Sequence, residues 1–154
     1  MSIRSAALED WQGISGLLTQ LEYPGTEDFL QIRLAGMLQD PAETLLVWAE
    51  PQPTPAGSEP RKYSHQTILG FLSLHFIPQI ALRGDFARIS YFAVDDSARS
   101  LGIGRKLEEM ATQLAKERGC AQMEVHCHTR RTRAHEFYTR QGWVESPKYL
   151  IKKL

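Results

Sequence analysis

The chain has 154 residues, of which 42% are hydrophobic, and this suits one domain, residues 1–154, with a single core and little room for a second. Eighteen basic residues balance eighteen acidic ones, so the chain lacks the basic excess of a nucleic-acid-binding protein. It contains no apolar run that could span a bilayer, and its first residues do not form a signal peptide. We therefore expect a cytoplasmic protein that binds neither nucleic acid nor membrane and keeps its two cysteines reduced.

The first third of the chain is predicted to contain a strand followed by two helices. Residues 3–6 form the strand, and acidic residues 9 and 10 favour the start of a helix whose apolar residues recur at helical spacing as far as Leu21. Residues 23–26 interrupt this pattern, and Thr26 or Asp28 can cap a second helix. Its apolar face comprises Phe29, Ile32, Leu34, Met37 and Leu38.

Strands and helices alternate through the rest of the chain. Residues 51–65 carry four prolines and few apolar side chains, which predicts a mobile surface loop. The alternation predicts an α/β fold in which helices form layers on a sheet. The predicted strands are 44–49, 67–76, 87–94, 122–127, 143–145 and 149–153, and the predicted helices are 104–118 and 132–141.

A glycine turn lies between the strand at 87–94 and the helix that follows it. The turn reads Arg99-Ser100-Leu101-Gly102-Ile103-Gly104. The first N–H groups of a helix have no partner within the helix, and together with the helix dipole they attract a phosphate. Glycines at this place let phosphate oxygens approach the backbone, while Arg99 and Arg105 add positive charge on either side. The turn therefore predicts a site for a pyrophosphate.

The glycine turn resembles the acetyl-CoA pyrophosphate loop of the GNAT N-acetyltransferase superfamily. That loop has the pattern Arg/Gln-x-x-Gly-x-Gly/Ala. A second segment, with Ala134, Phe137-Tyr138 and Gly142-Trp143, is similar to that superfamily's later helix-to-strand signature. The resemblance implies a mixed, mostly antiparallel sheet flanked by helices. It also implies a splay between residues 91–94 of one strand and 124–127 of its neighbour, around the acetyl-CoA site.

The same resemblance implies direct transfer of an acetyl group from acetyl-CoA to an amine, with acetyl-CoA as co-substrate and no metal. Tyr138 occupies the position of a tyrosine that lies near the thioester sulfur, and a phenol suits protonation of a departing thiolate. The alternative is that its ring only packs against CoA and orients it. Arg131 stands where many members carry an asparagine that contacts the pantetheine. The residues implied to bind acetyl-CoA are Phe92, Ala93, Val94, Arg99, Ser100, Leu101, Gly102, Ile103, Gly104, Arg105, Arg131 and Tyr138.

The general base does not follow from the sequence. Related small-molecule enzymes often carry an acidic residue on the strand before the glycine turn, where this chain has Tyr91. Deprotonation through water is an alternative, and His75 at the end of a strand is another candidate. The carboxylates considered for the water-mediated route are Glu22, Glu27, Asp85 and Glu124, and for each of them a solvated surface group is the commoner explanation.

Two histidines, His126 and His128, are expected on one face of the strand at 122–127 because side chains alternate along a strand. This spacing could bind a metal ion. Two ligands without a third make a poor zinc site, so we expect none.

The acceptor indicated by the resemblance is a primary amine of a small molecule, in the manner of aminoalkylphosphonate and aminoglycoside acetyltransferases. Segments near Leu21, Arg133 and the C-terminal Ile151-Lys152-Lys153-Leu154 carry this likeness. A protein N-terminal or lysine acetyltransferase shares the same fold, and a noncatalytic acyl-CoA-binding module is a third interpretation. A homodimer, to which the C-terminal strands would contribute, is also consistent with the family.

Overall fold

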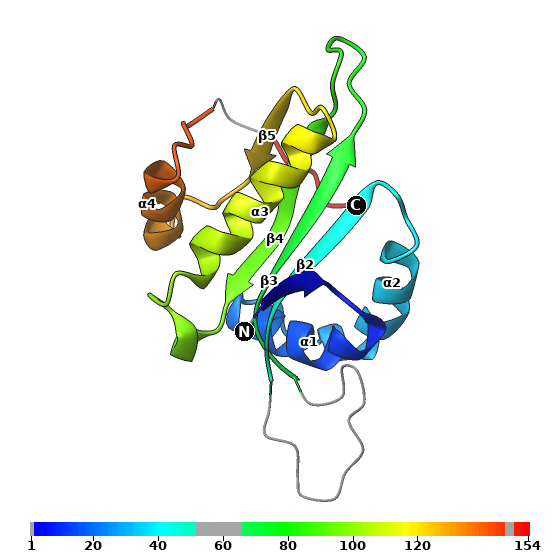
Figure 1. Cartoon of the computed structure of the whole chain (residues 1–154), viewed down its shortest axis with the longest axis vertical. Coiled ribbons are helices and arrows are strands. Elements are labelled where there is room, and N and C mark those ends of the chain that lie inside the picture. The colour runs from blue at the N-terminus through cyan, green and yellow to red at the C-terminus, as the bar shows by residue number, and fades with distance from the viewer. Residues whose placement is uncertain (1, 52–65, 147–149) are drawn as a thin grey trace, which may run out of the picture.

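The computed structural model describes residues 2–51, 66–146 and 150–154 and shows one five-stranded sheet with helices on both faces (Figure 1). The strands lie in chain order, β1-β2-β3-β4-β5. The first four pair antiparallel, and β4 and β5 pair parallel. This mostly antiparallel, mixed sheet confirms the predicted fold class. The strands are β1 Ser2–Ser5, β2 Glu43–Pro51, β3 Gln66–Ile77, β4 Phe86–Val94 and β5 Gln122–Val125; the α-helices are α1 Trp11–Gln20, α2 Leu30–Met37, α3 Ile103–Glu117 and α4 Thr132–Arg140.

Two hydrophobic cores cover the two faces of the sheet. Side chains alternate along β3, so Phe71 packs with α1 and α2 on one face while Leu72 and Leu74 pack with α3 on the other. Helix α3 can fill the second core because its buried residues, among them Leu107 and Ala111, recur at helical spacing. The sheet is therefore the middle layer, with α1 and α2 on one side and α3 on the other (Figure 1).

Strands β4 and β5 part at the edge of the second core. Their parallel ladder runs from Phe86 opposite Gln122 to Ile89 opposite Val125, where β5 ends. Strand β4 continues to Val94 beside β3, with an irregularity that leaves Ser90 as an extra residue between Ile89 and Tyr91. A bulge of this kind bends a strand and re-aims its side chains. The sheet thus has the predicted splay on the β5 side of residues 90–94, but the predicted bounds on the neighbouring strand are wrong in part, because Glu124 and Val125 are still paired with Arg88 and Ile89.

Several predicted elements differ from the structure. Residues 8–10 form a 3-10 turn (η1 Leu8–Asp10) before α1, and β5 ends at Val125, two residues short of the predicted strand. The final strands are wrong for the described residues: 143–146 and 150–154 have no regular structure. Val144 and Ile151 are exposed and have no core face to pack against. The predicted loop at 51–65 lies outside the described residues except for Pro51, which ends β2.

The β3–β4 connection packs tightly against the turn between α3 and β5, and this contact makes Gly84→Ala strongly destabilising. A Cβ at Gly84 would lie 2.3 Å from the carbonyl oxygen of Gly119 and 2.7 Å from the Ala121 nitrogen. Both are backbone atoms, so the two segments must separate, at a cost of about 3 kcal/mol. The free energy of unfolding in urea measures this loss.

Gly36→Ala is the matched control, because a Cβ at Gly36 meets nothing within 4 Å. Alanine is the better helix former, so this second variant should be as stable as the parent or slightly more so. Equal denaturation midpoints for the two variants would contradict the close contact at Gly84.

Candidate active site

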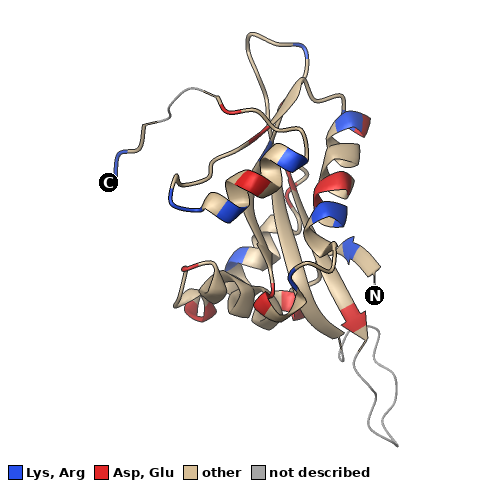
Figure 2. Cartoon of the chain, turned by 90° about the vertical axis from the view of Figure 1, so that its left-hand side faces the viewer, with Lys and Arg blue, Asp and Glu red and all other residues tan. Residues whose placement is uncertain are grey.

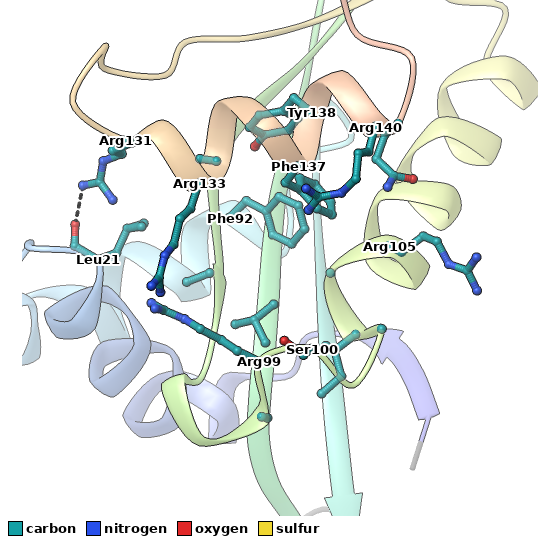
Figure 3. A pocket seen from close by; sticks show the side chains of 18 of the residues that line it. Leu21, Phe92, Arg99, Ser100, Arg105, Arg131, Arg133, Phe137, Tyr138 and Arg140 are labelled. Carbon is teal, nitrogen blue, oxygen red and sulfur yellow. Dashed lines mark hydrogen bonds between the residues drawn. The ribbon is translucent and has the colours of Figure 1, made fainter.

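A cavity of about 770 Å³ lies beside the splay, between the end of β4, the start of α3 and helix α4 (Figure 3). Phe92, Ala93 and Val94 of β4 form one wall, and the glycine turn forms another. Residues of α4, including Phe137 and Tyr138, cover the cavity from the opposite side. Its volume is within the range of cavities that hold a small molecule or cofactor.

The glycine turn presents the first backbone N–H groups of α3 to this cavity. Ser100 and Gly102 both have left-handed backbone angles, with φ of 67° and 80°. The Lys106 N–H bonds back to the Gly102 carbonyl at 3.1 Å, so the N–H groups before it in the helix lie ahead of the first intrahelical bond. Positive φ is rare for a residue with a side chain such as serine, and the sequence did not predict this backbone conformation at Ser100. The turn combines aligned donors with the positive end of the helix dipole.

Arginine side chains surround the cavity, and the described residues lining it include no aspartate or glutamate. Figure 3 shows Arg99 and Arg133 extended toward each other from the glycine turn and from α4. Basic segments mark the approach to α4 and its last turn (Figure 2). Such a lining attracts a ligand with several negative charges. The arginines are Arg99, Arg105, Arg130, Arg131, Arg133 and Arg140.

Helix α4 is anchored at both of its ends. Before its start, Arg131 donates to the Leu21 carbonyl at 2.8 Å (Figure 3), and Arg130 donates to the Glu22 carboxylate at 2.7 Å. After its end, the Trp143 indole donates to the Glu108 carboxylate of α3 at 2.9 Å. The first pair of contacts joins the segment after β5 to the end of α1, and so closes the far side of the splay. These contacts hold the segment after β5 in place across the gap from β4.

An aromatic cluster lines the inner part of the cavity. The ring centroids of Phe92 and Phe137 are 5.7 Å apart, and those of Phe137 and Tyr138 are 5.3 Å apart, in edge-to-face geometry. Trp143 packs against the other side of Tyr138, at 5.4 Å. These contacts hold the Tyr138 ring in place.

Burial raises the pKa of the Tyr138 phenol well above its usual value, and Cys127 and Glu108 nearby raise it further. Burial also raises the pKa of the Cys127 thiol. In such surroundings both an anionic phenolate and an anionic thiolate are disfavoured. Tyr138 is therefore a hydrogen-bond donor throughout the neutral range.

The structure brings together nearly all of the residues predicted to bind acetyl-CoA. Of the twelve, all except Leu101 line the cavity, and the Leu101 side chain is exposed. The prediction missed Arg140 and Gln141, which follow Arg133 and Phe137 at helical spacing and so share one face of α4. This helical spacing was the sequence signal that could have identified Arg140 and Gln141 as residues that line the cavity.

The candidate bases are scattered rather than gathered at the cavity. Glu22 is paired with Arg130 and Arg131, and Asp85 precedes β4 at the end remote from the glycine turn, near Arg118. Glu27 lies in the 3-10 turn η2 Thr26–Asp28 after α1. Glu124, on β5 directly before the splay, pairs with Arg88.

The histidines form no metal site among the described residues. The placement of His126 and His128 on one strand face is wrong, because β5 ends at Val125. His128 instead accepts a bond from the Arg130 N–H at 3.2 Å. His75 lies outside the cavity, 2.6 Å from the Glu43 carboxylate. The described part of the chain holds no cluster of three or more potential metal ligands, and none of its helices has the length and apolar character needed to cross a membrane.

A cavity lined by arginines and by the start of a helix, beside the place where two strands of a mixed sheet part, suits a ligand with several negative charges. The model of the Acetyltransferase (GNAT) family matches residues 11–143. The chain belongs to this family and is an acetyl-CoA-dependent acyltransferase. No curated protein sequence gave a match.

Solved structures share the fold over the full length of the chain. A putative acetyltransferase from Agrobacterium tumefaciens is 21% identical, with 99% of this chain and 100% of that one covered and a TM-score of 0.79. Glucosamine-6-phosphate N-acetyltransferase from Arabidopsis thaliana is 22% identical over 99% and 97% of the two chains, with a TM-score of 0.78. A ribosomal-protein-alanine N-acetyltransferase from Brucella melitensis biovar Abortus is 17% identical over 99% and 98%, with a TM-score of 0.71. At these identities the likeness shows the fold alone.

Proposed function

We propose that this chain transfers the acetyl group of acetyl-CoA directly to a primary amine of a small molecule. The observation that carries the proposal is the position of the arginine-lined cavity, which lies beside the gap where β4 and the segment after β5 part. A ligand held there by its phosphates would reach the gap with its other end. The acceptor then approaches from the opposite face of the sheet.

The residues of the cavity fit CoA on two counts. The N–H groups at the start of α3 and the surrounding arginines suit its phosphates. Beyond Ile89, the edge of β4 that faces β5 has no ladder partner among the described residues, and its backbone groups suit the amides of an extended pantetheine arm. Acetyl-CoA supplies the acetyl group in a form activated toward attack by an amine.

Tyr138 is proposed to act at the leaving sulfur. During transfer a nitrogen–carbon bond forms, the carbon–sulfur bond breaks, and the amine's proton passes to water or a nearby base. The sulfur needs a proton or a strong hydrogen bond as it leaves, and Tyr138 keeps its proton at neutral pH. The surroundings that raise the pKa of the Tyr138 phenol also raise the pKa of the CoA thiol. The two pKa values can therefore remain close enough for proton transfer.

The face of the sheet that carries α1 and α2 also holds a space of small-molecule size. A second cavity of about 470 Å³ lies beside α2 and the start of β2. This volume suits a small molecule.

The experiment is an assay of CoA thiol release with three acceptor sets: small primary amines, peptides with a free N-terminus, and peptides with an internal lysine. We expect turnover with small amines, and CoA binding by calorimetry. Turnover with peptides alone would favour a protein acetyltransferase. CoA binding with no turnover on any acceptor would favour a noncatalytic module.

A further inference from the structure

Glu108 is a buried carboxylate on the side of α3 that faces α4. Only 6% of the residue is exposed. It shares this side of the helix with Gly104 and Thr112, which lie one turn before it and one turn after it. A Cβ at Gly104 would lie 3.4 Å from the Phe137 ring, so this side of α3 packs on α4. Glu108 therefore lies just beyond the glycine turn, where the two helices beside the cavity meet.

The hydrogen-bond partners of Glu108 are neutral groups. Its Oε1 accepts from the Trp143 indole at 2.9 Å and from the Thr112 hydroxyl at 3.1 Å. Among the described residues it forms no ion pair, whereas Asp10, the other carboxylate buried there, is paired with Arg4. A buried carboxylate without a cation costs stability. Proteins retain such costs mainly at functional sites.

Trp143 connects Glu108 with Tyr138. Helix α4 ends in a glycine cap, in which Gly142 has a φ of 86° and the Trp143 N–H donates to the Tyr138 carbonyl at 3.0 Å. The Trp143 ring also packs on the Tyr138 ring, with centroids 5.4 Å apart. Trp143 is thus joined to Tyr138 twice, and the bond from its indole to Glu108 fixes both residues relative to α3.

The hydrogen bond of Glu108, rather than its charge, is the contribution that matters at neutral pH. Burial raises the pKa of the Tyr138 phenol, and the charges of Cys127, after β5, and of Glu108, on α3, raise it further. An ordinary tyrosine is already protonated at neutral pH. Removing the charge of Glu108 would therefore leave the phenol a donor, but removing its bond to Trp143 would release the end of α4.

We propose that Glu108 is a positioning residue for acetyl transfer, which holds the Tyr138 phenol at the leaving sulfur through its hydrogen bond to Trp143. This inference rests on the proposed function, in which Tyr138 acts at that sulfur. A displacement of about 1 Å in a reacting group can lower a rate about a hundredfold. Loss of the bond should therefore lower kcat, by no more than Tyr138→Phe does, because that variant lacks the phenol itself.

The test compares three variants that change this bond. Glu108→Leu removes the acceptor and keeps most of the volume, and Trp143→Phe removes the donor and keeps an aromatic ring beside Tyr138. Glu108→Gln keeps an oxygen that can accept from the indole. With a small amine at saturating acetyl-CoA, Glu108→Leu and Trp143→Phe should each lower kcat about tenfold or more. Glu108→Gln should stay within about threefold of the parent.

Glu117→Leu is the matched control. Glu117 lies on the same helix and accepts a side-chain hydrogen bond, from Gln113 at 2.8 Å, but it is exposed at the end of α3. Its kcat should equal that of the parent. Thermal unfolding checks the fold of each variant. If Glu108→Leu does not fold, Trp143→Phe tests the same bond from its other end.

The decisive comparison repeats Glu108→Leu in the Tyr138→Phe protein. A residue that acts through Tyr138 has little left to affect there, so kcat should change by less than about twofold. A general weakening of the structure would instead lower kcat by the same factor in both proteins, and this result would overturn the inference. Parental kcat in Glu108→Leu, or an equal loss in Glu108→Gln and Glu108→Leu, would also overturn it.

NMR of isotope-labelled tyrosine rings tests the positioning without any acetylation. The chain has five tyrosines, and Tyr138→Phe identifies the signal of Tyr138. Neighbouring rings should shift this signal; Glu108→Gln should keep the shift and Glu108→Leu should change it. An unchanged signal in Glu108→Leu would contradict the inference. If no amine is acetylated, or if Tyr138→Phe keeps full turnover, the proposed function fails, and the ring signal still decides whether Glu108 positions Tyr138.

Discussion

Gly104→Val is expected to weaken CoA binding about a hundredfold or more while leaving the fold intact. A Cβ at Gly104 would lie 3.4 Å from the Phe137 ring and 3.7 Å from the Phe92 ring, which are ordinary contacts. The protein itself therefore has room for the first added carbon, but the branched side chain would fill the place where phosphate oxygens meet the start of α3. Losing about two charge-assisted hydrogen bonds accounts for a change of this size.

Calorimetry with CoA measures the effect, and thermal unfolding without ligand checks the fold. Gly16→Val is the matched control, because Gly16 lies in α1 and a Cβ there meets nothing within 4 Å. Gly102 is a less clean test, since its φ of 80° strains any side chain. Arg99→Ala should cost less than Gly104→Val, because it removes one charge and leaves the backbone donors. Parental CoA affinity in a folded Gly104→Val protein would place the pyrophosphate elsewhere.

Tyr138→Phe is expected to lower kcat by about a hundred- to ten-thousandfold, the usual contribution of a general acid. The phenyl ring keeps the edge contacts with Phe137 and Trp143, so the affinity for acetyl-CoA should change little. Steady-state kinetics with several amines, together with CoA calorimetry, separate the two effects. A loss of affinity with unchanged turnover would make Tyr138 a positioning residue. Full turnover, with chemistry shown to be rate-limiting, would exclude it as the acid.

The pH profile supplies a second readout on Tyr138. Its pKa is raised, and the donor is the protonated form, so the hydrogen is lost only at a pH above the usual range for a phenol. The rate should therefore rise as the acceptor amine loses its proton, with no fall up to about pH 10, the ordinary pKa of tyrosine. A fall in rate between pH 8 and 10 that is absent in Tyr138→Phe would contradict the raised pKa.

Much of the site could be predicted because its signals are local in the sequence. The glycine turn between a strand and a helix placed Arg99, Gly102 and Gly104, and the Phe137-Tyr138 segment placed α4. These features depend on backbone conformation and helical spacing within a few residues. The splay was implied by the family resemblance, and the structure shows it as the end of pairing at Ile89 and Val125.

The features of the fold and of the site that could not be predicted depend on contacts between distant parts of the chain. The pairing of Glu22 with Arg130 and Arg131 joins residues more than a hundred positions apart. No local sequence pattern predicts such a pairing. The alignment of Glu43, His75, Arg88 and Glu124 across the sheet likewise exists only in the register of four strands. The final strands at 143–145 and 149–153 were wrong for the described residues because alternation of side chains predicts a strand only where a neighbour and a core are present.

The order of the strands has a consequence for how the enzyme is assembled during synthesis. Strands β1 to β4 pair with their neighbours in sequence, so this antiparallel portion can fold as it leaves the ribosome. The pairing of β5 with β4 is different, because the segment between them, about 30 residues that include α3, must be made first. This pairing rests on four residue pairs. Strand β4, which forms one wall of the cavity, thus folds before α4, which covers the cavity. The site is therefore complete only when α4 has been made. Hydrogen exchange should accordingly show the weakest protection in β5 and α4, and CoA, which would contact both portions, should raise it there.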